Sequence, residues 1–188
     1  MKILSNFILK IANWKSLLIF FLIYIAFNAF FFPKGFKSDV PIADQNLPIL
    51  DLQMTYNPEN VKDIVAMYNG AAKQAYILSA TITDGIYPIV YFLLFGIAFS
   101  LVFYKWRINP WFKYINILPL SIVFFDYMEN TMIVQMLKTA PADLGMMPTY
   151  CSTFTMIKWL FTTIFLILLI AGITTNVLKK GKNTWNTF

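Results

Sequence analysis

The stretch that decides the fold is STFTMIKWLFTTIFLILLIAGITTNVL, which occupies residues 152–178. Its centre is an unbroken run of Phe, Leu and Ile side chains, and Lys158 is the only charged residue in it. An α-helix rises about 1.5 Å per residue, so about 20 apolar residues cross the hydrocarbon core of a bilayer. This stretch is therefore long enough to cross a membrane as one helix.

Three further apolar runs lie upstream, and the predicted spans are 12–32, 86–104, 114–137 and 152–178. Each run ends near aromatic or basic residues, which are typical interfacial anchors. Hydrophobic residues make up 59% of the 188 residues and charged ones 13%, whereas a soluble domain carries about a quarter charged residues. The sequence predicts an all-α membrane protein, with residues 1–188 forming one domain built as a four-transmembrane-helix bundle.

The first run has two interpretations. Basic residues precede it, as they precede the apolar part of a secretory signal peptide, and they are Lys2, Lys10 and Lys15. No A-x-A cleavage pattern follows the apolar stretch. We therefore interpret the run as a retained signal anchor.

The distribution of lysine and arginine predicts the orientation. Nine basic residues fall on one side of the predicted spans: Lys2, Lys10, Lys15, Lys105, Arg107, Lys113, Lys179, Lys180 and Lys182. The other side carries Lys34, Lys37, Lys62, Lys73 and Lys138, together with most of the acids. Because the more basic side faces the cytoplasm, both termini are predicted to be cytoplasmic. The chain lacks an amphipathic, Arg-rich leader, so a bacterial cytoplasmic (inner) membrane is expected. The net charge of +6 indicates topology and contact with anionic lipid, not nucleic-acid binding.

The long loop between the first two spans, residues 33–85, is predicted to be extracytoplasmic and partly helical. Apolar residues alternate with polar ones from Leu50 to Tyr56, which favours a short strand. Asn57-Pro58-Glu59 then provides a helix start. The apolar face of that helix comprises Val61, Ile64, Val65 and Tyr68, and Gly70 is expected to end it before a further helix over 71–80. We expect a lid, which either rests on the bundle or gates a pocket below it.

Polar side chains in the spans are costly and therefore informative. Spacings of three, four and seven place Asp84, Tyr87 and Tyr91 on one face of the second span. The same rule groups polar residues of the third and fourth spans: Asp126, Glu129 and Asn130, and then Thr155, Lys158 and Thr162. By the helical rise, Glu129 lies about 12 Å and Lys158 about 9 Å from the outer ends of their helices. We expect these faces to converge on a pocket in the outer half of the membrane.

Two interpretations of this polar set remain open. Lys158 can pair with Glu129 or Asp126, in which case the network simply holds the helices together. Two carboxylates and one lysine, however, leave a surplus acid that must be protonated, hydrated or bound to a ligand. The predicted ligand-binding residues are Asp84, Tyr87, Tyr91, Asp126, Glu129, Asn130 and Lys158, with Asp126 and Glu129 as candidate catalytic acids or bases. The chain has no histidine and one cysteine, Cys151, so no metal site or cofactor is predicted.

Several of these motifs occur together in a known pattern. D-x-x-Y-P-x-x-Y spans Asp84 to Tyr91, F-D-Y-M-E-N spans Phe125 to Asn130, and Lys158 is followed by Trp159. With the Pro-Glu segment near residue 58, this pattern resembles a bacterial family of small four-span membrane proteins. The resemblance covers most of the chain from residue 50 onward. It implies no particular activity, but it adds weight to the same polar residues.

The leading functional hypothesis is binding of a small or lipid-derived ligand in the outer-half pocket, with transport as an extension of that role. A second hypothesis is a membrane enzyme acting on a lipid or isoprenoid, with Asp126 or Glu129 as acid or base and Lys158 holding an anionic group. A third is a structural or channel-forming subunit that uses the polar network to hold its helices together. Membrane lipid is the expected partner, and a homo-oligomer is left open.

Overall fold

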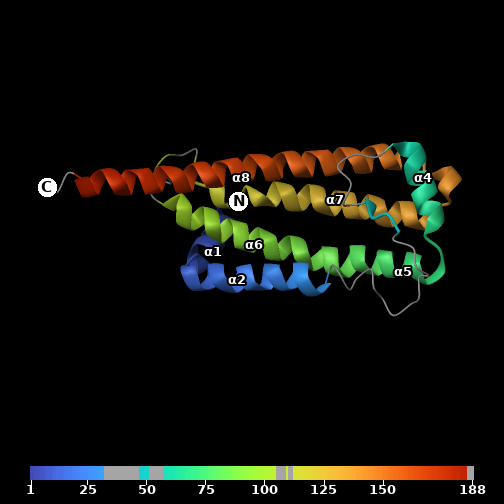
Figure 1. Ribbon diagram of the computed structural model, residues 1–188, viewed down its shortest axis with the longest axis horizontal. Helices are drawn as coiled ribbons and strands as arrows, with labels where there is room; N and C mark the ends of the chain where they lie inside the picture. The colour runs from blue at the N-terminus through green and yellow to red at the C-terminus, as the bar shows by residue number, and fades with distance from the viewer. Residues whose placement is uncertain (32–46, 51–56, 105–108, 110–111, 186–188) are drawn as a thin grey trace.

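The computed structural model is helical over the residues that the structure describes, which are 1–31, 47–50, 57–104, 109 and 112–185 (Figure 1). Its helices are α1 (Lys2–Ile11), α2 (Trp14–Ala26), η1 (Phe27–Phe31), α4 (Pro58–Met67), α5 (Gly70–Leu78), η3 (Ser79–Thr83), α6 (Asp84–Val102), η6 (Ile115–Ile117), α7 (Pro119–Lys138), η7 (Pro141–Asp143) and α8 (Met147–Trp185). The helical fold class is confirmed for these residues.

Within the described part of the chain, three helices are long and apolar enough to cross a membrane, namely Gly70–Val102, Ile115–Lys138 and Met147–Lys179. Two of them are longer than predicted. The second begins at Gly70, because α5, η3 and α6 follow one another without a break. The fourth, α8, extends beyond 152–178 at both ends. In Figure 1 these helices lie side by side, with α2 against α6.

The first predicted span, 12–32, begins at a break between two helices, and its described part is not by itself one of these membrane-length helices. The chain turns by 98° between α1 and the helix that starts at Trp14. Asn13 causes the new start, because its backbone is extended and its side chain accepts a hydrogen bond from the Ser16 backbone N–H at 2.9 Å. Counted as one bent span, this pair would raise the number of membrane-length segments to four.

The amino-terminal helix α1 folds back onto the protein, which the sequence did not predict. Ser5 Oγ donates to Asn116 Oδ1 at 2.7 Å, and the Asn116 amide returns a 3.0 Å hydrogen bond to the Ser5 carbonyl. Ile8 is fully buried beside Gly96. A Cβ atom at Gly96 would lie 2.9 Å from the Asn116 carbonyl oxygen, so the close approach of α1 and η6 to α6 requires glycine there.

The structure confirms part of what the sequence predicted for the segment before α6, namely the start of α4 and its buried face. Asn57 caps α4 by accepting from the Glu59 N–H at 3.1 Å, and the predicted apolar face is buried: Val61, Ile64, Val65 and Tyr68. This face joins a core with the ends of α7 and α8. The prediction that Gly70 ends α4 is wrong. The helix α4 ends at Met67, and Gly70 begins α5 with φ of +44°. The predicted strand over 50–56 lies outside the described residues, apart from Leu50.

Candidate functional site

Three of the four predicted charged residues, Asp126, Glu129 and Lys158, form one largely buried cluster between α7 and α8. Lys158 Nζ lies 3.2 Å from Asp126 Oδ1 and contacts Glu129 Oε2. Lys158 therefore pairs with both carboxylates, where the sequence left the choice of partner open. Helical periodicity explains the arrangement, because residues three apart on α7 present their side chains on the same face.

Neighbouring hydroxyl groups complete this cluster. Tyr91 on α6 donates to Asp126 Oδ2 at 3.0 Å, and Thr155 on α8 donates to Glu129 Oε1 at 2.6 Å. Every oxygen of the two carboxylates thus has a protein partner. Glu129 is fully buried, while the side chains of Asp126 and Lys158 are each 13% exposed. The cluster is a closed network that connects α6, α7 and α8.

An aromatic chain extends the network towards α2. The Tyr87 and Tyr91 rings meet edge to face with centroids 5.5 Å apart, and Tyr24 stacks on Tyr87 at 5.6 Å. Asn28, in the π-helical turn η1, donates to the Tyr87 hydroxyl at 3.1 Å. The network with its aromatic extension therefore reaches all the membrane-length segments.

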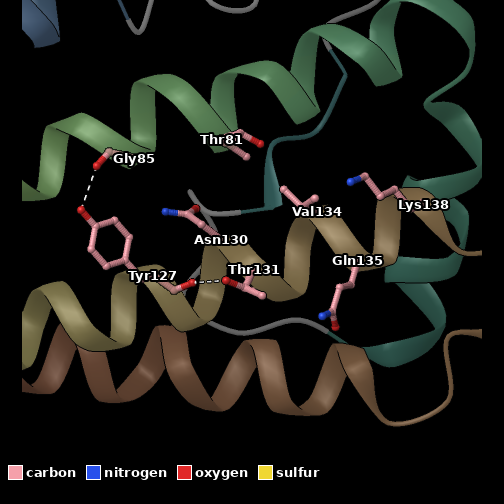
Figure 2. A pocket seen from close by; sticks show the side chains of 9 residues that line it. Thr81, Gly85, Tyr127, Asn130, Thr131, Val134, Gln135 and Lys138 are labelled. Carbon is pink, nitrogen blue, oxygen red and sulfur yellow. Dashed lines mark hydrogen bonds between the residues drawn. The ribbon is translucent and has the colours of Figure 1, made fainter.

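A separate pocket of about 540 Å³ lies between α7 and the continuous helix formed by α5, η3 and α6 (Figure 2). Its lining residues are Ala80, Thr81, Gly85, Tyr127, Asn130, Thr131, Val134, Gln135 and Lys138. The residues from α7 recur every three or four positions, so they occupy a stripe distinct from the one that carries Asp126 and Glu129. Five of the nine described lining residues are polar and uncharged, while apolar atoms form the larger part of the lining surface.

Asn130 is the unusual residue of this pocket. It is only 6% exposed, yet its side-chain amide has no hydrogen-bond partner among the described residues. Ser100 Oγ is the one fully buried side-chain polar atom without a partner among the described residues, so the Asn130 amide is not sealed from the pocket but opens onto it. Figure 2 shows Asn130 projecting from α7 towards the helix that carries Thr81 and Gly85. The pocket is thus lined by an amide that can both donate and accept hydrogen bonds.

A π-helical turn forms the opposite wall. Ala80 and Thr81 belong to η3, which interrupts an otherwise α-helical segment. Such turns are rare and occur frequently at functional sites. Tyr127 closes one end of the pocket, because its hydroxyl donates to the Gly85 carbonyl at 2.8 Å. The wider turn and the tyrosine shape the space beside Asn130.

The predicted site residues are thus divided between two places. Tyr91, Asp126, Glu129 and Lys158 meet in the network, and Tyr87 adjoins it. Asn130 alone lines the pocket. Asp84, the first residue of α6, is 8% exposed and does not line the pocket. Whether these residues bind a ligand stays a prediction.

Sequence reasoning missed the other polar residues of the pocket, which include Thr81, Thr131, Gln135 and Lys138. Thr131, Gln135 and Lys138 lie on the same stripe of α7 as Asn130. Continuing the three- and four-residue spacing from Asn130 to the end of α7 would have identified them. Within the described ranges, no three Asp, Glu or Cys side chains gather as a metal site.

The resemblance to a bacterial four-span family stays a prediction. Comparisons with protein-family models, curated proteins and solved structures gave no match.

Proposed function

We propose that the chain is a multipass membrane protein that crosses a bacterial cytoplasmic membrane four times and binds a small or lipid-derived ligand between α7 and the α5–η3–α6 helix. The lengths and compositions of the helices support the crossings, with the bent α1–α2 pair counted as one span. In Figure 1 the turn between α1 and α2 and the last described part of α8 lie towards one end of the molecule, and α4 lies at the other.

The placement of charges supports an orientation with the termini in the cytoplasm. Among the described residues, the turn between α1 and α2, the segment before η6 and the last part of α8 carry lysines and no acid: Lys10, Lys15, Lys113 and Lys179. The α4 end carries three lysines and three acids: Lys62, Lys73, Lys138, Glu59, Asp63 and Asp143. A basic end opposite a neutral end fits the positive-inside rule. In this orientation α4 forms part of an outer lid over the ends of α7 and α8.

The unpaired amide of Asn130 is the observation that supports ligand binding most strongly. A structural polar network satisfies its own donors and acceptors, as the network around Lys158 does. Asn130 is equally buried but faces a pocket without a partner in the described protein. A ligand hydroxyl or carbonyl would supply the missing hydrogen bonds.

The contrast between the network around Lys158 and the pocket beside Asn130 also favours ligand binding over acid–base catalysis. Neither Asp126 nor Glu129 lines the pocket, and all their oxygens already have partners. A general acid must come within hydrogen-bond reach of the substrate. The network is therefore proposed to fix the helices that build the pocket, with no role in a chemical step.

The proposal is tested by native mass spectrometry of the protein extracted from its own membranes. The wild type should retain a bound molecule of defined mass, and Asn130→Leu should lose it. Asn6→Leu is a matched control, because Asn6 is an exposed residue on α1, far from the pocket. Equal ligand retention by wild type and Asn130→Leu, with both proteins folded, would overturn the proposal.

A further inference from the structure

We propose that the ligand of this pocket is an anionic amphiphile, such as a long-chain carboxylate or phosphate monoester, a class that includes lipid headgroups. This inference rests on the proposed function. Among the described residues that line the pocket, Lys138 is the only charged one, and none of them carries a carboxylate. The other polar lining groups are hydroxyls and amides, which serve equally as donors.

The charges around the pocket define how such a ligand would lie. Lys138 follows Asn130 by eight residues on α7, or about 12 Å along the helix axis. Close to the Asn130 end, Asp126, Glu129 and Lys158 carry one net negative charge when all are ionised. An anionic group is therefore favoured at the Lys138 end, and a neutral hydroxyl or carbonyl at the Asn130 end.

The Lys138 end is suited to an anion. Lys138 is exposed and forms no ion pair within the part of the chain that the structure describes. Gln135 lies one turn before it and adds amide donors. Hydrogen bonds from an ammonium group to a carboxylate or phosphate are roughly twice as strong as neutral ones. In the proposed orientation, this end of α7 also lies at the outer surface of the membrane, where a lipid headgroup would be.

The pocket also has a wall for an apolar chain. Ala80 and Val134 contribute its apolar lining. Leu78 lies one helical turn before the lining residue Thr81 and is 59% exposed, so a chain leaving the pocket past Thr81 would meet an apolar side chain. A free inorganic anion would use Lys138 but leave this wall and the Asn130 amide without contacts.

The ligand class is tested with three probes on the protein in nanodiscs of zwitterionic phosphatidylcholine. Dodecyl phosphate carries both the chain and the anion, dodecanol carries only the chain, and inorganic phosphate carries only the anion. Of the three probes, we expect only dodecyl phosphate to raise the melting temperature of the protein, and we expect this rise to level off as the probe concentration increases. Lys138→Gln should weaken its binding by about tenfold or more, as expected for losing a charge-assisted hydrogen bond.

Lys113→Gln is the matched control, because it removes an exposed lysine that precedes η6 and α7, whereas Lys138 is the last residue of α7, and it should leave binding unchanged. Equal binding of dodecanol and dodecyl phosphate, both abolished by Asn130→Leu, would overturn the anionic class while leaving the pocket intact. Binding of inorganic phosphate as tight as that of dodecyl phosphate would overturn the amphiphile. Binding unaffected by both Asn130→Leu and Lys138→Gln would overturn the site itself.

Discussion

Replacing Lys158 with methionine should destabilise the protein strongly, because it removes the only cation from the buried network. Lys158 contacts both Asp126 and Glu129, and Glu129 is fully buried. Removing one partner of a buried ion pair costs about 3–5 kcal/mol, since the remaining charge is left uncompensated. We expect Lys158→Met to lower the free energy of unfolding by about this amount.

A second substitution should restore much of this loss, and the structure ranks the candidates. Glu129→Gln should rescue Lys158→Met best, because a neutral amide removes the charge that has no access to water and still accepts from Thr155. Asp126→Asn should rescue it less. The side chain of Asp126 is 13% exposed and accepts a hydrogen bond from Tyr91, so its charge costs less without Lys158 and its removal restores less stability.

The assay is a double-mutant cycle with the free energy of unfolding measured by SDS titration in mixed micelles. Lys113→Met removes an exposed lysine and should change stability by less than about 0.5 kcal/mol. Coupling of about 2 kcal/mol or more between positions 158 and 129 is expected, within the range seen for residues of one network. If the double mutant loses the plain sum of the single losses, the network does not hold the helices together.

Other predictions concern topology and local packing. In a background lacking the native cysteine, a cysteine at Lys62 should react with an impermeant maleimide on intact cells, and one at Lys179 should react only after lysis; the reverse pattern would invert the proposed orientation. Ser5→Ala should cost about 1–3 kcal/mol in a denaturation experiment, because it leaves a buried amide oxygen of Asn116 unpaired. Asn57→Ala should cost about 0.5–2 kcal/mol through loss of the α4 cap, and a change near zero would show that α4 does not unfold with the rest.

Helical periodicity made part of this site predictable from the sequence. Asp126, Glu129 and Lys158 share a depth because position along a helix converts directly into distance, and their charge requires partners in an apolar setting. The start of α4 was equally predictable, because Asn57 and Pro58 are residues that helix starts favour.

Contacts between distant segments were not predictable in this way. Ser5 and Asn116 are 111 residues apart, and nothing local to either indicates the other. The fold-back of α1 depends on the small volume of Gly96, which acts only once the helices have packed. The pocket likewise depends on the π-helical turn at 79–83, whose sequence SATIT resembles an ordinary helical segment.

The central claim, that the pocket holds a specific ligand and is more than a lipid-facing surface, is tested most directly by photo-crosslinking in native membranes. A photoreactive amino acid replaces Val134, which lines the pocket, or Leu160, which is 58% exposed on α8. We predict one dominant anionic adduct at position 134, lost in Asn130→Leu, and at position 160 a mixture that mirrors the bulk lipids. The same mixture at both positions would contradict the claim.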